Sequence, residues 1–157
     1  MVGFAACSPE MPQAPPHYYL VQYKYPINGA DSAVIGYLGG AVVLSIPAVN
    51  SVVFQSQSEL TVFESIPDKW TVDTVSGPEM AVLVAVTLKA DATPDDVAAV
   101  NALATGRRPA QPYPTSPRLL ETWFRLSAIS QLAALSTIGS VGLEYPGSSQ
   151  AGVVGRQ

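Results

Sequence analysis

The chain has 157 residues, the usual length of one domain, with 48% hydrophobic residues, 13% charged residues, a net charge of −4 and one cysteine, Cys7. The acidic balance and the scattered lysines and arginines argue against a dedicated nucleic-acid-binding protein, whose affinity comes mostly from neutralised phosphates. A single cysteine excludes an intrachain disulfide, and no apolar run is long enough for a transmembrane helix. Because so few charges are available to cover the surface, the composition predicts large apolar contact areas.

The first third of the chain predicts an arm followed by short strands. Residues 1–16 are rich in proline, which stiffens an extended chain. Residues 18–27 alternate between two faces as a strand does, and they end in turn-forming residues. Two further short β runs are expected at 33–38 and 41–46, joined by the two glycines at 39 and 40.

The middle of the chain predicts more strands. A strand is expected at 49–55, and residues 59–66 fit either a strand or one helical turn. Residues 69–76 alternate well. Residues 80–89 give the clearest strand, and since both of its faces are largely apolar, we expect it to be central and covered on both sides.

A helix is expected to begin at Thr93. Threonine caps free backbone N–H groups, Pro94 suits the first helical position, and Asp95 and Asp96 favour the positive end of the helix dipole. Gly106 fits the end of this helix.

The last third of the chain is less clear. Residues 107–117 hold four prolines and are expected to form a loop. Residues 118–138 fit a helix or strands, a last strand is expected at 137–145, and residues 146–157 form a tail. No internal repeat is apparent, so the sequence indicates one domain over 17–145.

Three residues are candidates for contacts with another subunit or with RNA: His17, Arg107 and Arg108. His17 is the only histidine, and no G-x-S-x-G motif accompanies it, so a packed or interface histidine is expected. If it has a role, it is a protonation-dependent contact in an assembly. Arg107 and Arg108 follow the predicted helix, where cations are favourable.

The acidic residues indicate no catalytic or metal site. One histidine and one cysteine cannot build a zinc site, and the acidic residues do not match a calcium loop. Asp91, Asp95 and Asp96 are explained by helix capping, with a calcium ion between subunits as the other hypothesis. Acid–base pairs are conceivable among four carboxylates that the sequence cannot bring together: Glu59, Glu64, Asp68 and Asp73. We therefore expect no catalytic residue, no metal and no cofactor.

The order of elements resembles small icosahedral RNA-virus coat proteins, especially the tymovirus-like group. The resemblance lies in the runs 60–66, 69–75 and 80–89, the helix at Thr93–Pro94, the stretch 116–120 and the final β run to Tyr145. It implies a jelly roll of two four-stranded sheets packed face to face. It also favours strands over a helix at 118–138, and the family tolerates the absence of a basic RNA-binding arm.

These observations predict a mainly β, antiparallel β-sandwich, jelly-roll-like, with one or two short helices. The resemblance implies a viral capsid protein that assembles with copies of itself, and with other capsid subunits, into an icosahedral shell in the virion. Direct nucleic-acid binding is expected to be weak or absent, and no membrane contact is expected. The alternative is a protruding, decoration or phage-tail binding module that attaches to a larger assembly or receptor; an enzyme that uses carboxylates alone is the third hypothesis.

Overall fold

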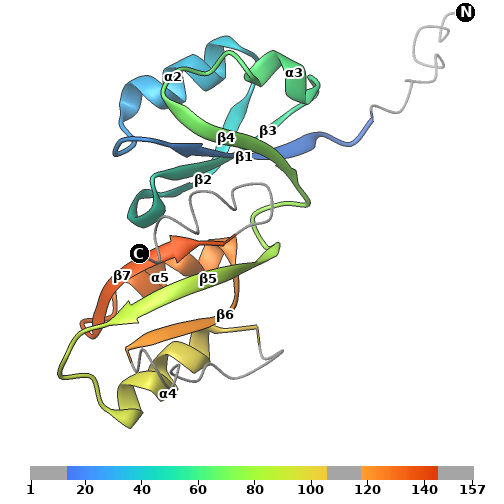
Figure 1. Cartoon of the computed structure of the whole chain (residues 1–157). Coiled ribbons are helices and arrows are strands. Elements are labelled where there is room, and N and C mark those ends of the chain that lie inside the picture. The colour runs from blue at the N-terminus through green and yellow to red at the C-terminus, as the bar shows by residue number, and fades with distance from the viewer. Residues whose placement is uncertain (1–13, 106–117, 145–157) are drawn as a thin grey trace, which may run out of the picture.

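The computed structural model describes residues 14–105 and 118–144, which form two antiparallel sheets (Figure 1). The first half contains β1 (His17–Tyr23), α2 (Gly29–Tyr37), β2 (Ala41–Ile46), η1 (Pro47–Val49), β3 (Ser51–Ser56), α3 (Leu60–Phe63) and β4 (Lys69–Val75). The second half contains β5 (Ala81–Leu88), α4 (Pro94–Leu103), β6 (Leu119–Arg125), η2 (Leu126–Ala128), α5 (Ile129–Ala133) and β7 (Ile138–Leu143). The predicted mainly β, antiparallel fold class is confirmed.

Both halves follow the same plan, which the sequence did not indicate. Sheet A has the strand order β2-β3-β1-β4, and helices follow its first and third strands, so the first half is a β-α-β-β-α-β unit. In the described residues, sheet B has the order β6-β5-β7 and repeats the first, third and fourth strands of this arrangement. Most of the chain between α4 and β6 lies in 106–117, outside the described residues. The strand order therefore differs from the two four-stranded sheets that the resemblance implied.

The predicted strand at 33–38 is wrong, because residues 33–37 belong to helix α2 and Leu38 is its C-cap. The helix begins with a reciprocal cap at Asn28: the Ala30 N–H donates to Asn28 Oδ1, and the Asn28 N–H donates to Asp31 Oδ2, both at 2.8 Å. Such a capping box satisfies N–H groups that a helix start leaves unpaired, and it outweighs the β-like run of side chains that follows.

The ambiguous segments resolve into short helices and strands. Residues 59–66 hold the single helical turn α3, and 118–138 hold β6, η2 and α5, so the helix and strand interpretations were each right in part. The helix predicted at Thr93 is confirmed as α4. The described residues contain four α-helices where one or two were expected, because α3 and α5 are too short to show a helical period and α2 has strand-like side chains.

One face of sheet A packs against α2 and α3. Tyr19 and Val21 of β1 and Phe54 of β3 point to this face, where they meet Ile35 of α2 and Phe63 of α3. The rings of Tyr19, Phe54 and Phe63 lie 4.7–5.4 Å apart, which is the spacing of favourable aromatic contacts. The Tyr19 hydroxyl donates to the Ser58 carbonyl oxygen at 2.6 Å, so its polar end is satisfied.

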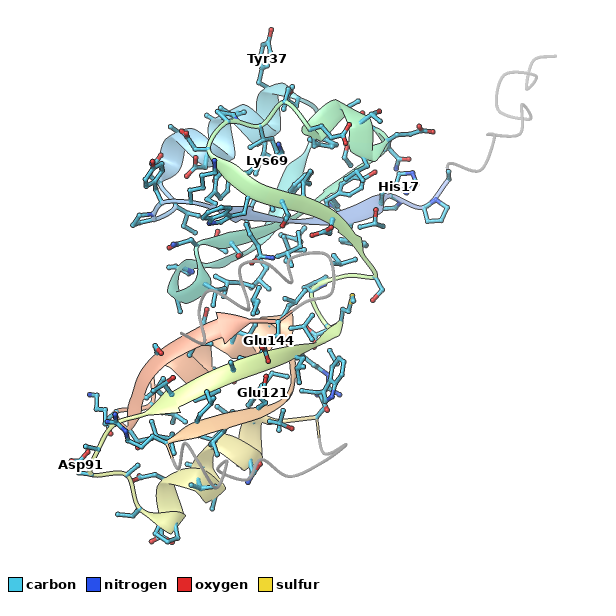
Figure 2. All side chains as sticks on the ribbon, viewed as in Figure 1. His17, Tyr37, Lys69, Asp91, Glu121 and Glu144 are labelled. Atoms are coloured by element: carbon cyan, nitrogen blue, oxygen red, sulfur yellow. The ribbon has the colours of Figure 1, made fainter. Side chains whose placement is uncertain are left out.

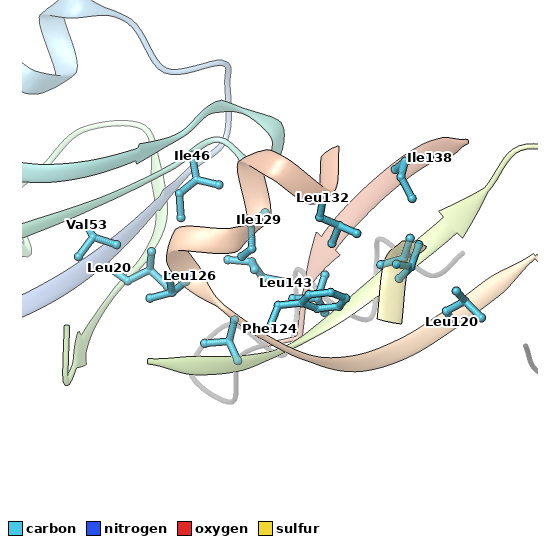
Figure 3. Packing of buried hydrophobic residues seen from close by; sticks show 14 of the residues in the cluster. Leu20, Ile46, Val53, Leu120, Phe124, Leu126, Ile129, Leu132, Ile138 and Leu143 are labelled. Atoms are coloured by element: carbon cyan, nitrogen blue, oxygen red, sulfur yellow. The ribbon is translucent and has the colours of Figure 1, made fainter. Parts of the chain in front are cut away.

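The other face of sheet A packs against the second half of the chain. Leu20, Ile46 and Val53 are fully buried, and they share one apolar cluster with Leu126 of η2 and Ile129 of α5 (Figure 3). In Figure 1, β7 is the strand of sheet B that lies nearest to sheet A. The two halves thus share one core, although each has its own sheet.

We expect the two halves to unfold together because of this shared core. Ile129→Ala removes buried carbons and leaves a cavity, so it should cost about 2–5 kcal/mol of stability. Trp70 lies on sheet A and Trp123 on sheet B. The Trp123→Phe variant keeps Trp70 as the fluorescent reporter of the first half, and the Trp70→Phe variant keeps Trp123 as the reporter of the second half. In urea titrations, Ile129→Ala should shift both reporters by the same amount. A shift seen by Trp123 alone would contradict the shared core.

We expect Gly40 to tolerate no side chain. A Cβ atom there would lie 2.7 Å from Ile35 Cγ2 and 2.8 Å from Phe54 Cδ2, and both residues are fully buried. Gly40→Ala should therefore lower the free energy of unfolding by roughly 1–3 kcal/mol. Gly36→Ala is the matched control: nothing lies within 4 Å of its Cβ, and alanine in a helix raises stability by up to about 1 kcal/mol. Equal effects of the two substitutions in a denaturant titration would contradict the close packing at Gly40.

Candidate functional site

The candidate site is the face of sheet B that points away from its helices, which we call the outer face. Along β5, Val82, Val84 and Val86 point inward and share a cluster with Val100 of α4 and Ile129 of α5. The alternate residues of the strand form the outer face. Within 14–105 and 118–144, the helices place their buried side chains on the inner face of sheet B or on sheet A.

The strand register gives the outer face three rows. Leu83 lies opposite Trp123, Ala85 lies between Glu121 and Gly142, and Thr87 lies between Leu119 and Ser140. Glu144 continues the first row, because its N–H donates to the Leu83 carbonyl oxygen at 2.7 Å. The centre is therefore low, built from the small residues Ala85 and Gly142, and larger side chains stand around it.

The corresponding face of sheet A is covered by other parts of the chain. There Leu20 and Val53 are fully buried beneath the second half of the chain. On sheet B, Leu83, Leu119 and Trp123 are half-buried. The two halves follow one plan, but only sheet A has its second face covered by other described elements.

Two carboxylates lie on the outer face. Figure 2 shows Glu121 and Glu144 on the near side of sheet B, while α5 lies behind it in Figure 1. Both residues are half-buried, and they stand on either side of β5. Further out, Arg125 Nε lies 3.9 Å from Glu79 Oε1 in an exposed pair, which contributes little to stability.

The residues singled out from the sequence do not join this site. His17 is exposed at the start of β1 in sheet A, with its ring 6.0 Å from that of Tyr19 (Figure 2). Arg107 and Arg108 lie outside the described residues. The intersubunit or RNA contacts proposed for these three residues stay predictions.

The acidic residues at the start of α4 serve in part as a cap. Asp96 Oδ2 accepts from the Thr93 N–H at 2.7 Å and from the Thr93 hydroxyl at 3.0 Å, while the Asp96 N–H donates to Thr93 Oγ1 at 3.4 Å. Over the described ranges, no group of three or more histidine, cysteine or acidic side chains is arranged to hold a metal ion. Over the same ranges, no helix is both long and apolar enough to cross a membrane.

The residues of the outer face were missed by sequence reasoning, although one signal pointed to them. Residues 80–89 are apolar on both faces, which predicted a central strand covered on both sides. β5 is central, since it pairs with both β6 and β7. The described residues supply a helical cover for only one of its faces, and the other face is the candidate site.

No family model, curated protein or solved structure matches this chain.

We expect Tyr23 to make the protein sensitive to alkaline pH. Its hydroxyl is buried without a partner, and burial, together with the nearby Asp31 carboxylate, raises its pKa to about 12. The folded state therefore holds the phenol proton more tightly than the unfolded chain does, whose tyrosines have a pKa near 10.0. Stability from this residue is fully present below pH 10 and is lost as the pH rises towards 12.

Urea unfolding of the Tyr23→Phe variant between pH 10 and pH 12 tests this expectation. The variant should lose less stability over that range than the wild type. Tyr37→Phe is the control, because Tyr37 is 90% exposed and should leave the alkaline loss unchanged. An identical alkaline loss in the wild type and in Tyr23→Phe would refute the effect.

Proposed function

We propose that this chain is a binding module that docks another protein on the outer face of sheet B. The observation that carries the proposal is that two similar sheets differ in the burial of their second faces. Sheet A has helices on one face and the second half of the chain on the other. Sheet B has helices on one face, and on the other a half-buried apolar surface that includes Leu83, Leu119 and Trp123.

The size of the outer face suits the centre of an interface. Strands lie about 4.8 Å apart and rise about 3.4 Å per residue, so three strands of this length offer an area on the order of 300 Å². Only part of this area is apolar, because Glu121, Glu144, Thr87 and Ser140 lie on the same face, so the apolar part is smaller than the largest apolar patches of ordinary proteins. A standard interface covers about 800 Å² per partner, so surrounding residues would complete its rim.

The chemistry of the face favours a different protein over a second copy. Symmetric pairing of two copies would bring Glu121 and Glu144 of each copy into one shared layer. Like charges that face one another across an interface oppose association. A partner that presents an apolar side chain to Ala85 and Gly142, with basic side chains around it, fits the acidic charge of this face better.

This proposal develops the binding-module alternative of the sequence analysis. Assembly with copies of itself, and the viral shell, the virion location and the absence of catalysis expected from the resemblance, stay predictions. The oligomeric state of the purified chain is the measurement that tests self-assembly.

Site-specific photocrosslinking in the native cells tests the docking face. Ser140 is exposed on the outer face opposite Thr87, so a benzoylphenylalanine at Ser140 should give one discrete adduct with another protein. The same photoreactive residue at Tyr37, which is 90% exposed on α2, should not give this adduct. Leu83→Asp should abolish the adduct, whereas Val43→Asp on β2, which is 40% exposed, should preserve it.

The outcomes are distinguishable. An adduct of twice the chain mass would replace the proposed partner with a second copy. Equal adducts at Ser140 and Tyr37, or an adduct that survives Leu83→Asp, would refute docking on this face. Circular dichroism of the Leu83→Asp variant checks that the fold is retained; Leu83→Ser serves as a milder substitution if it is not.

A further inference from the structure

An open groove lies at one end of sheet B, where the chain passes from β5 into α4 (Figure 1). It encloses about 650 Å³, within the range of about 300–1,000 Å³ that is usual for small-molecule sites. Leu88 lines the groove and belongs to the inner cluster that includes Val100 of α4. The groove therefore lies on the helix side of sheet B and is separate from the outer face.

Most of the side chains that line the groove are aliphatic. Leu88, at the end of β5, is almost fully buried and forms the floor, while Pro94 and Val97 come from the start of α4. Ala90 and Ala92, in the loop between them, carry only methyl groups and leave room for an occupant. Such a lining stabilises a hydrocarbon group by removing it from water.

Two cations border the groove. Lys89 and Arg118 both line it, and both are exposed. The backbone holds them close together, because the Leu88 N–H donates to the Arg118 carbonyl oxygen at 2.7 Å. Within 14–105 and 118–144, neither cation forms an ion pair, and the pair of Arg125 with Glu79 lies at the other end of the β5–β6 pairing. Two cations on adjacent strands attract an anion to this end of the groove.

The nearby carboxylates do not neutralise these cations. Asp96 accepts hydrogen bonds from the N–H and the hydroxyl of Thr93 in the helix cap. Asp91 and Asp95 are exposed and do not belong to the lining. In the described part of the chain, the lining thus carries two positive charges and no negative charge.

We propose that this groove binds a small aliphatic carboxylate, whose hydrocarbon chain lies against Leu88 and Val97 and whose carboxylate pairs with Lys89 and Arg118. An amine with the same chain would meet two like charges, which oppose binding. A carboxylate without the chain would gain only exposed ion pairs, which are weak. The site is separate from the docking face and does not depend on it.

Titration of the full chain with octanoate tests the proposal, with acetate as the control for the chain and octylamine as the control for the charge. In ¹H–¹⁵N spectra, octanoate should shift the backbone amides of Ala90, Ala92 and Val97 in a saturable manner. Each buried methylene group strengthens binding by about fourfold, so acetate should bind at least about 100-fold more weakly. Octylamine should bind about tenfold more weakly than octanoate.

Variants at exposed positions separate the proposed contacts from unspecific binding. Lys89→Gln and Arg118→Gln should each weaken octanoate binding by about three- to fivefold, the usual contribution of an exposed ion pair. Arg125→Gln removes the same charge at the other end of β6 and should leave the affinity unchanged. Ala90→Glu places a carboxylate in the groove and should weaken binding at least about tenfold, whereas Ala102→Glu, on α4 and outside the lining, should not.

Several outcomes would overturn the proposal. These are the absence of saturable shifts with octanoate, equal binding of octylamine, and full affinity in both Lys89→Gln and Arg118→Gln. Shifts of the Trp123 indole N–H in place of the Val97 amide would assign octanoate to the outer face and would likewise overturn it.

Discussion

The arrangement of the whole chain depends on the burial of one face of sheet A beneath the second half. Leu20, Ile46 and Val53 are removed from water by Leu126 and Ile129, which come from far along the chain. A fully buried side chain of this kind contributes about 1.5–3 kcal/mol, so a handful of such contacts is comparable to the whole stability of a domain. This contact turns two similar units into one folded body. It also places β7 beside the end of β1 and directs the outer face of sheet B away from the shared core.

The outer face follows from the same constraint. Sheet A uses both of its faces within the chain, so most of its apolar residues are explained by internal packing, although Val43 of β2 and Trp70 of β4 stay exposed. Sheet B meets sheet A mainly through β7 and the η2–α5 segment. Its second face therefore keeps Leu83 and Trp123 half-buried, and these side chains gain by further burial. The unequal burial of two sheets built on one plan is a property of the packing, and it gives the second half a surface that the first half lacks.

The alternation of side chains and the helix-capping residues predicted those strands and helix starts that depend only on nearby residues. The strands at 41–46 and 69–75 and the cap at Thr93 depend on neighbouring residues, and each could be predicted from the sequence. Residues 33–38 were wrongly predicted as a strand, because Val34, Ile35 and Tyr37 are residue types common in strands. The Asn28–Asp31 cap, which decides for a helix, lies just before them. α5 has five residues, too few for its period to be recognised. The outer face was beyond such reasoning, since Leu83 meets Trp123 only through tertiary structure.

The buried amide of Gln22 sets a cost against the shared core at the junction of the two halves. Gln22 Nε2 is buried without a hydrogen-bond partner, and the side chain lies on the same face of β1 as Leu20, which is packed in the apolar core. An unsatisfied buried group costs about 1–3 kcal/mol, which is a noticeable share of a net stability of about 5–15 kcal/mol. An apolar side chain at this position would extend the shared core and remove the cost. The chain therefore gives up stability at the junction of its halves.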